Sequence, residues 1–148
     1  MGRVPFILRA ATVADTEALL ALWAVAAEND SRPTDTAEAV RALIGRDPGA
    51  TIVADSDGEL VGSVIAGWDG WRYHLYRLAV RPDWRRKGIA TALLDAAEVR
   101  FAALGSTRAD AMVLAANDQG KSLWRALGYE EQQDWRRWVK SLSGASGA

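Results

Sequence analysis

Residues suited to binding an anionic ligand are concentrated between positions 78 and 90. An apolar run at 78–80 is followed by a short loop, three basic residues at 85–87 and Gly88, where an amphipathic helix is expected to begin. The free N–H groups of a helix start, with the helix dipole behind them, bind anions such as phosphates. Gly88 would let a ligand approach the backbone without meeting a Cβ. The spacing matches neither the Walker phosphate loop nor the three-glycine dinucleotide fingerprint.

The distribution of charge also indicates an anionic ligand in the second half of the chain. The formal net charge is −1, but residues 1–74 hold six Lys/Arg against eleven Asp/Glu, whereas residues 75–148 hold twelve against eight. A bipolar chain favours an anion on its basic half and a cation on its acidic half. Nucleic-acid binding is disfavoured, because the pI is near 5.8 and the chain has one short basic stretch, Arg81, Arg85, Arg86 and Lys87.

Length and composition are those of one globular domain. The chain has 148 residues, 49% of them hydrophobic and 25% charged, which predicts a single domain over residues 1–140 with a flexible tail at 141–148. Cysteine is absent and His74 is the one histidine, so no disulfide, thiolate site or metal is expected. No apolar window of 18 residues and no apolar leader occurs, which predicts a cytoplasmic protein without a membrane segment.

Hydrophobic periodicity predicts a mixed domain, α/β in content and α+β in arrangement. The Asp69-Gly70 pair between two apolar runs is a hairpin signal, and apolar residues recur at helical spacing from Gly88 to Leu104. We expect a mostly antiparallel sheet flanked by about four helices. Strands are expected at 6–9, 50–54, 59–68, 71–80, 111–115 and 129–140, and helices at about 12–26, 36–44, 88–104 and 117–127.

In motif and element order the sequence resembles the GCN5-related N-acetyltransferase (GNAT) superfamily. The pyrophosphate loop of that family has the form Arg/Gln-x-x-Gly-x-Gly/Ala, which residues 85–90 match with alanine in the last place. A strand ending in an apolar run precedes the loop, and a bulge splays this strand from its neighbour. An asparagine, an apolar helix and Leu-Gly-Tyr follow in the family, as at Asn117 and at residues 127–129 here.

The resemblance implies acetyl-CoA as co-substrate, held mainly by the backbone. The amides of residues 86–90 would bind the pyrophosphate, with side-chain contacts from the three basic residues. Leu78 and Val80 would offer main-chain hydrogen bonds to pantetheine, and the Val80 N–H would polarise the thioester carbonyl. Asn117 would cap the last helix and reach the pantetheine arm. The implied cofactor-binding residues are Leu78, Val80, Arg85, Arg86, Lys87, Gly88, Ile89, Ala90 and Asn117.

One position departs from the family pattern. Seven residues after the asparagine many members carry a tyrosine that donates a proton to the departing thiolate, and this chain has Trp124. An indole N–H is a hydrogen-bond donor but not a usable acid. A thiolate with a pKa near ~8.5 can take its proton from water. Tyr129 and Ser122 are alternative donors that nothing in the spacing favours, and Trp124 is equally well explained as a core residue.

The general base has several candidates. His74 lies where some relatives place a base, but it is also close to a hairpin turn, where an exposed histidine is ordinary. A water chain to Asp69, Glu28 or Asp30 would serve as well. Strand alternation would put residues 74, 76, 78 and 80 on one face and residues 75, 77 and 79 on the other, unless a bulge intervenes.

Arg77 and two tryptophans complete the candidates. A charged residue within an apolar strand should be paired or functional, so Arg77 either recognises substrate or pairs with an acid of a neighbouring strand. Trp68 and Trp71 flank the hairpin turn and could wall an acceptor pocket or pack across the hairpin. The candidate substrate-binding residues are Glu28, Asp69 and Arg77.

The favoured interpretation is an N-acetyltransferase that transfers an acetyl group from acetyl-CoA by direct attack of a primary amine. The acceptor could be a small molecule, a peptide N-terminus or a lysine side chain. The alternative is an acyl-CoA-binding sensor or partner module that has lost catalysis, which the absence of the family tyrosine makes credible. A homodimer through an exposed aromatic C-terminal strand is a further possibility.

Overall fold

The computed structural model describes residues 5–30 and 32–142 and divides into two compact units, residues 1–112 and 113–148. The first unit contains the β-sheet and helices α1 to α3, and the second contains helix α4 (Asp118–Ala126). Of the tail expected at 141–148, residues 143–148 lie outside the described residues.

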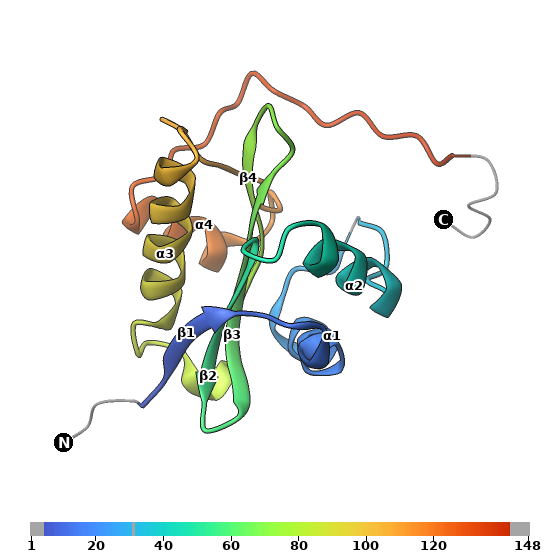
Figure 1. Ribbon diagram of the computed structural model, residues 1–148. Coiled ribbons are helices and arrows are strands. Elements are labelled where there is room, and N and C mark those ends of the chain that lie inside the picture. Colours follow the sequence, from blue (N-terminus) through green and yellow to red (C-terminus); the bar gives the residue numbers. More distant parts are fainter. Residues whose placement is uncertain (1–4, 31, 143–148) are drawn as a thin grey trace. The chain divides into compact units, whose positions relative to one another are not determined.

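The sheet of the first unit has five strands in the spatial order of the sequence (Figure 1). Neighbouring strands are antiparallel except β4 and β5, which are parallel and are connected through helix α3 (Ile89–Ala103). The mixed, mostly antiparallel sheet predicted from the sequence is therefore confirmed. Its strands are β1 (Ile7–Ala10), β2 (Thr51–Ser56), β3 (Glu59–Trp68), β4 (Tyr73–Val80) and β5 (Asp110–Ala111).

The hairpin between β3 and β4 forms where the Asp69-Gly70 pair predicts it. Gly70 has φ +90°, and the Asp69 Oδ1 atom accepts hydrogen bonds from the N–H groups of Trp71 and Arg72, both at 2.7 Å. Because these amides belong to the turn, β4 begins at Tyr73 rather than at the expected position 71.

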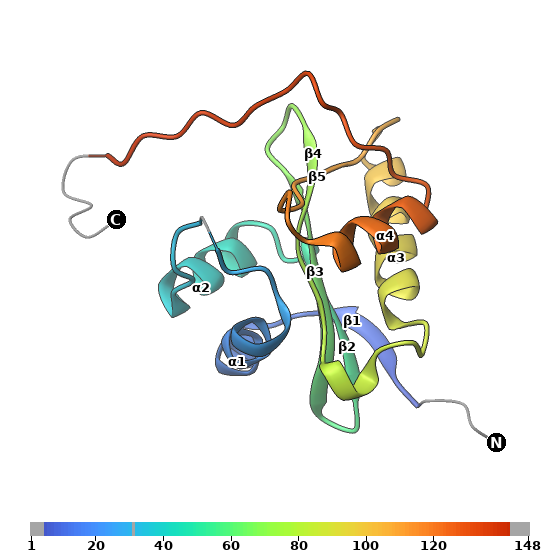
Figure 2. The same cartoon turned by 180° about the vertical axis from the view of Figure 1, so that it is seen from behind.

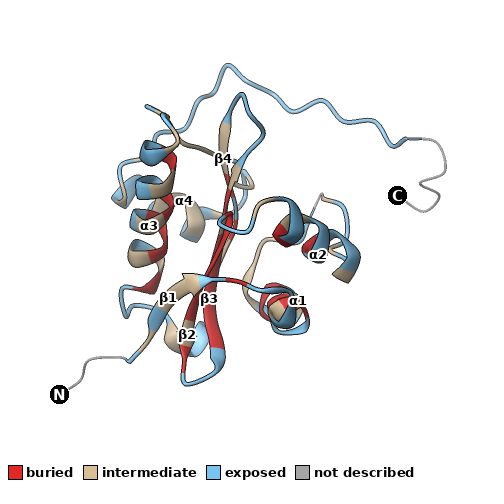
Figure 3. Cartoon of the chain, viewed as in Figure 1, coloured by how far each residue is buried: buried red, intermediate tan, exposed pale blue. Residues whose placement is uncertain are grey.

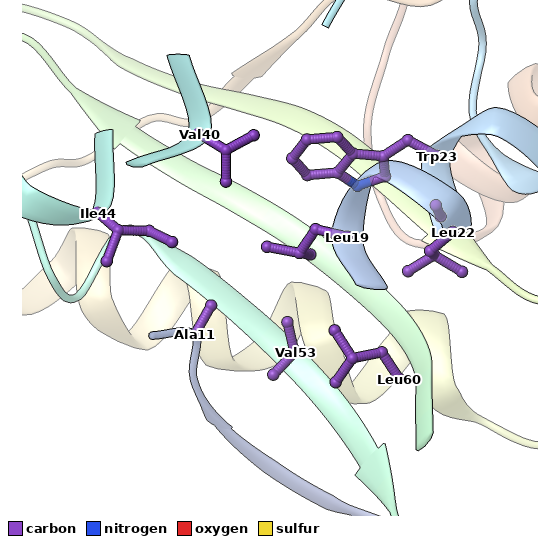
Figure 4. Close-up of a cluster of buried hydrophobic side chains, with 9 residues drawn as sticks. Ala11, Leu19, Leu22, Trp23, Val40, Ile44, Val53 and Leu60 are labelled. Atoms are coloured by element: carbon purple, nitrogen blue, oxygen red, sulfur yellow. The ribbon is translucent and has the colours of Figure 1, made fainter. Parts of the chain in front are cut away.

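Helices α1 (Thr16–Ala26) and α2 (Ala37–Arg46) cover one face of the sheet. The Thr36 side chain accepts a hydrogen bond from the Ala39 N–H and so caps α2. Side chains from both helices and from the sheet form one apolar cluster (Figure 4), and in Figure 3 the buried positions of both helices face the strands. The cluster contains Ala11, Leu19, Leu22, Trp23, Val40, Ile44, Val53, Leu60 and Ala79.

Helix α3 covers the opposite face, as the two views in Figures 1 and 2 show. The apolar stripe expected at helical spacing is buried, at Ile89, Leu93, Leu94, Ala97 and Phe101. A side chain at Gly62 of β3 would meet Ile89 and Leu93, so the missing Cβ lets the start of α3 approach the sheet closely.

The last third of the chain differs from expectation at two predicted strands. The strand expected at 111–115 is limited to Asp110–Ala111, and residues 129–140, expected to be a strand, form none. Alternation of apolar and polar residues assigns side chains to two faces but supplies no partner strand. Trp135 is 71% and Val139 82% exposed, so the pattern has no apolar surface to cover it among the described residues. The homodimer predicted from the sequence depends on an exposed C-terminal strand, and residues 129–140 form no such strand.

Candidate functional site

The centre of β4 is a β-bulge. Ser63 is paired with Ala79 and Ile65 with Tyr76, so β4 has one residue more than β3 between these pairs. Arg77 is in the bulge and has φ +53°, a left-handed conformation that is rare for a residue with a side chain.

The bulge changes which side chains share a face. His74, Tyr76 and Arg77 all lie on the face that α1 and α2 cover. Val80 lies opposite a glycine of β3 against which α3 packs, so Val80 and, by alternation, Leu78 face α3. The bulge that the sequence analysis allowed for is present, and its extra residue breaks the simple alternation beyond Tyr76.

The backbone of Val80 is directed away from β3. Arg81 donates its N–H to the Val61 carbonyl at 2.9 Å, which makes Gly62 and Val80 a pair without hydrogen bonds between them. The N–H and C=O of Val80 therefore point toward the β5 side of β4. The parallel ladder with β5 has two pairs, at His74 and at Leu75, so Val80 lies beyond its end.

The loop after β4 presents three cations and the open start of α3. Arg85, Arg86 and Lys87 are exposed, and none of them forms an ion pair with a described residue. Arg86 has φ +62° and Gly88 φ +82°, so two left-handed residues shape the turn. The Arg85 Nε atom donates to the Val80 carbonyl at 3.3 Å, which links the loop to the end of β4.

Helix α3 begins without a side-chain cap. Gly88 is its N-cap, and the first hydrogen bond within the helix joins the Ala92 N–H to the Gly88 carbonyl at 3.0 Å. The N–H groups of residues 89–91 precede that bond and so have no partner within the helix. The turn and the helix start together form the arrangement that binds anions at helix N-termini. Arg81, at the start of the loop, lies 3.4 Å from Glu59 instead.

Arg77 is buried and paired. Its Nη1 donates to the Glu28 carbonyl at 2.6 Å and to the Asn29 Oδ1 at 3.1 Å, and its Nη2 pairs with Asp35. Burial lowers the pKa of Arg77 from its ordinary value, and the nearby Arg32 acts in the same direction, while Asp35 opposes both. The sequence predicts a pairing with an acid of a neighbouring strand, but the partner belongs to the segment between α1 and α2.

A cavity of about 250 Å³ lies between α2, β3 and the hairpin turn on the same face as Arg77. It brings the candidates Asp69 and His74 together, and Trp68 and Tyr76 supply aromatic walls. The N–H groups of Arg72 and then of Trp71 hold the pKa of Asp69 below its usual range, so Asp69 is an anion at neutral pH. Trp71 is 72% exposed outside this cavity, with the Arg72 guanidinium 4.5 Å above its ring.

The two candidate catalytic groups, His74 and Val80, are far apart along β4. They are six positions apart in the sequence, and at about 3.3 Å per position with one position taken up by the bulge, their Cα atoms are roughly 17–20 Å apart. An imidazole at His74 therefore cannot touch an amine that attacks a carbonyl held by the Val80 N–H. Glu28 is closer to the bulge, because its carbonyl contacts Arg77.

The candidates in the second unit lie in helix α4 or next to its ends. The Asn117 side chain accepts the Gly120 N–H at 2.9 Å and caps α4, as expected. Trp124 packs edge-to-face against Tyr129, with ring centroids 4.9 Å apart. Ser122 is exposed. This contact supports the interpretation of Trp124 as a packing residue within its own unit.

Comparison with known proteins decides the family. A family model described as the Acetyltransferase (GNAT) family matches residues 16–129. The chain belongs to the GNAT acetyltransferase family. Over 117 residues it is 37% identical to an acetyltransferase of Pectobacterium atrosepticum, which covers 78% of this chain and 82% of that protein. Over 89 residues it is 40% identical to an acetyltransferase of Sodalis glossinidius, covering 60% of this chain and 63% of that protein.

Solved structures share the GNAT fold. A PaiA N-acetyltransferase of Thermoplasma acidophilum in complex with coenzyme A superposes with a TM-score of 0.76 at 20% identity, over 86% of this chain and 91% of that one. An aminoglycoside 6'-N-acetyltransferase of Acinetobacter haemolyticus gives 0.70 at 18% identity, over 92% and 99%. The predicted family, fold and acetyltransferase activity are thus confirmed. No helix within residues 5–30 and 32–142 has the length and apolar character to cross a bilayer.

Sequence reasoning missed two parts of this GNAT site. The first is a pair of consecutive hydrogen bonds. Trp23 Nε1 donates to the Ser63 Oγ (2.8 Å), and the Ser63 hydroxyl donates to the Arg77 carbonyl (2.9 Å). The second is the pairing of Arg77 with Asp35. A buried serine between apolar residues of a strand is the only signal for the first. Asp35 carries no signal, because nothing local relates it to a residue 42 positions away.

Proposed function

We propose that this GNAT acetyltransferase uses acetyl-CoA and binds its pyrophosphate at the start of α3. The observation that carries the proposal is the uncapped N-terminus of α3 after two left-handed residues, next to three exposed cations without ion pairs. The amides of residues 86–90 would donate to the phosphate oxygens, while Arg85, Arg86 and Lys87 supply charge. Structural neighbours were solved in complex with coenzyme A, which supports acetyl-CoA as the co-substrate.

The thioester would lie along the free side of β4. Leu78 and Val80 would donate and accept main-chain hydrogen bonds to pantetheine, and the Val80 N–H would polarise the acetyl carbonyl. The orientation of Val80 away from β3, beyond the end of the β5 ladder, supports this role. A preorganised donor of this type stabilises the tetrahedral oxyanion, typically by ~2.7–4 kcal/mol.

Transfer would proceed by direct attack of a neutral primary amine. The amine nitrogen forms a bond to the carbonyl carbon, the carbon–sulfur bond breaks, and the nitrogen loses one proton. The thiolate of coenzyme A takes a proton from water, because Trp124 has no acidic proton to give. Asn117 would contact the pantetheine arm in addition to capping α4. The family match spans residues 16–129, which supports one acetyltransferase domain over residues 1–140.

The acceptor would approach from the face that α1 and α2 cover. The carboxylate of Glu28 would attract the reacting amine, in agreement with the acidic first half of the chain. The cavity at Asp69 and His74, which Arg46 and Asp47 also line, would hold a more distant part of the acceptor. Because of its distance from Val80, His74 would remove the proton through a chain of waters, and Glu28 or Asp30 could do the same over a shorter path.

The test is steady-state and single-turnover kinetics on an amine panel of tyramine, spermidine, kanamycin and a lysine peptide. We expect coenzyme A thiol release and an acetylated amine, with double-reciprocal lines that intersect rather than run parallel. Mass spectrometry of the quenched protein should show no acetyl adduct. Parallel lines together with an acetylated protein would contradict direct attack. Thiol release that no amine accelerates would contradict amine transfer.

A further inference from the structure

Arg77 combines three features that packing alone does not require. It adopts a left-handed backbone conformation in the middle of a strand, its side chain is buried, and it is charged. Glycine is the residue that adopts this conformation without strain, and an apolar side chain is the one that burial favours. A residue that is unfavourable on both counts indicates that the guanidinium itself has a task.

The guanidinium fastens both ends of the segment between α1 and α2. Near the end of α1 it donates to the Glu28 carbonyl and to the Asn29 side chain, and before α2 it pairs with Asp35. The Asn29 amide also donates to the Trp23 carbonyl at 3.1 Å, which ties the same turn to the last residues of α1. Only a planar fork with several N–H groups can reach these partners together.

The backbone of Arg77 is fixed from the other side. Its carbonyl accepts the Ser63 hydroxyl, and that hydroxyl accepts the indole N–H of Trp23. The Arg77 guanidinium also lies 5.5 Å from the centre of the Trp23 ring, within cation–π range. Helix α1, strand β3 and the bulge of β4 are thereby joined through one residue.

We propose that Arg77 is a positioning residue, which sets the distance between the acceptor-side segment 27–36, of which residues 27–30 and 32–36 are described, and the β4 bulge that orients the Val80 amide. This inference rests on the proposed function, because it assigns the segment to the acceptor and the amide to the thioester. The guanidinium binds groups of this chain, the Glu28 carbonyl and the Asn29 and Asp35 side chains, and so acts on substrate through them. Its loss therefore affects how the amine meets the carbonyl and leaves the pyrophosphate loop, which makes no contact with the guanidinium, unchanged.

Two substitutions separate the hydrogen-bonding geometry of the Arg77 guanidinium from its charge. Arg77→Lys retains the charge, but its single nitrogen cannot occupy the separate positions from which Nη1 and Nη2 reach their partners. Arg77→Gly suits the left-handed backbone and leaves a space shaped for guanidinium, so added guanidinium ion at a concentration below that which unfolds the protein should restore turnover. The control is Arg9→Lys, since Arg9 makes a similar paired fork to Asp15 and Asp55 at the edge strand, away from the site.

The measurements are the Michaelis constants for acetyl-CoA and for the best amine of the panel, with hydrogen exchange of the amides in segment 27–36. For Arg77→Lys we expect the acceptor KM to rise tenfold or more, the acetyl-CoA KM to change less than twofold, and exchange to accelerate at least tenfold. Arg9→Lys should leave both KM values and the exchange rate of segment 27–36 unchanged. Guanidinium should restore Arg77→Gly and not Arg77→Lys.

The outcomes that overturn the inference differ from those that overturn the proposed function. Equal rises in both KM values, or unchanged exchange in segment 27–36, would show that Arg77 does not position the acceptor side. Absence of turnover by the wild type would overturn the proposed function, and hydrogen exchange would still decide whether Arg77 holds the segment.

Discussion

Gly62→Ala tests how closely α3 must approach the sheet. A Cβ at this position would lie 2.8 Å from Ile89 Cγ2, 3.1 Å from Leu93 Cδ1 and 3.3 Å from the Ala79 carbonyl oxygen. Ordinary van der Waals contact begins near 3.4 Å, so Ile89 would have to move by about 0.6 Å. Ile89 is the first residue of α3 and directly follows Gly88. The added methyl group therefore displaces the helix start that would bind pyrophosphate.

The cost follows from overpacking. Adding a methyl group to a well-packed core typically costs about 1–3 kcal/mol, and the backbone carbonyl of Ala79 cannot yield as a side chain can. For a chain of this size each kcal/mol lowers the Tm by roughly 3–4 °C, so Gly62→Ala should melt about 3–12 °C below wild type. The acetyl-CoA KM should rise as well.

The control is Gly45→Ala, in α2, where a Cβ meets nothing within 4 Å. Alanine is favoured over glycine in a helix by about 0.5–1 kcal/mol, so this variant should melt slightly above wild type and leave the acetyl-CoA KM unchanged. Differential scanning fluorimetry and initial rates on both variants suffice. If Gly62→Ala melts at or above wild type with an unaltered acetyl-CoA KM, the packing of α3 does not set the helix start.

Three other substitutions test individual contacts of the fold and the site. Ser63→Ala leaves the indole N–H of Trp23 buried without its acceptor, so the free energy of unfolding measured in urea should fall by about 1–3 kcal/mol. A decrease below about 0.5 kcal/mol would contradict a stabilising role for the hydrogen bonds of Ser63. Arg9 holds the pKa of Asp15 below its usual range. This ion pair therefore stabilises the fold at pH values above the unfolded-state pKa of Asp15, about 3.9, and the stabilisation is lost as the pH falls through the pKa of Asp15 in the folded protein. Arg9→Gln should thus lower the Tm at pH 7 and converge with wild type in acid, and a constant difference would contradict the pairing. His74→Gln should lower kcat and leave the acetyl-CoA KM unchanged, because the water chain loses its proton acceptor, and an unchanged kcat would show that the chain ends at another group.

The elements that sequence could predict are those encoded by neighbouring residues. The Asp69-Gly70 turn, the apolar stripe of α3 and the cap at Asn117 each depend on residues within a few positions of one another, and each forms as predicted. The loop at 85–88 belongs to this group, since the run of basic residues and glycine is contiguous.

The features that sequence could not predict depend on distant partners. The bulge at Arg77 is compensated by Glu28 and Asp35, 49 and 42 residues away, and a one-residue insertion in a strand leaves no trace in the alternation pattern. The same limit explains the strand wrongly expected at 129–140, where the pattern was present and the partner strand was not. Family resemblance supplied the bulge as an expectation but not the residue that forms it.

The start of α3 is proposed to bind the pyrophosphate of acetyl-CoA. Calorimetric titration of acetyl-CoA into wild type, Gly88→Glu and Gly105→Glu measures that binding. Both glycines are exposed, left-handed and open to a side chain, at opposite ends of α3, so the two variants carry the same charge and the same backbone strain. We predict micromolar binding by wild type and Gly105→Glu and none by Gly88→Glu. Equal binding by all three proteins, or no binding by wild type, would contradict the account.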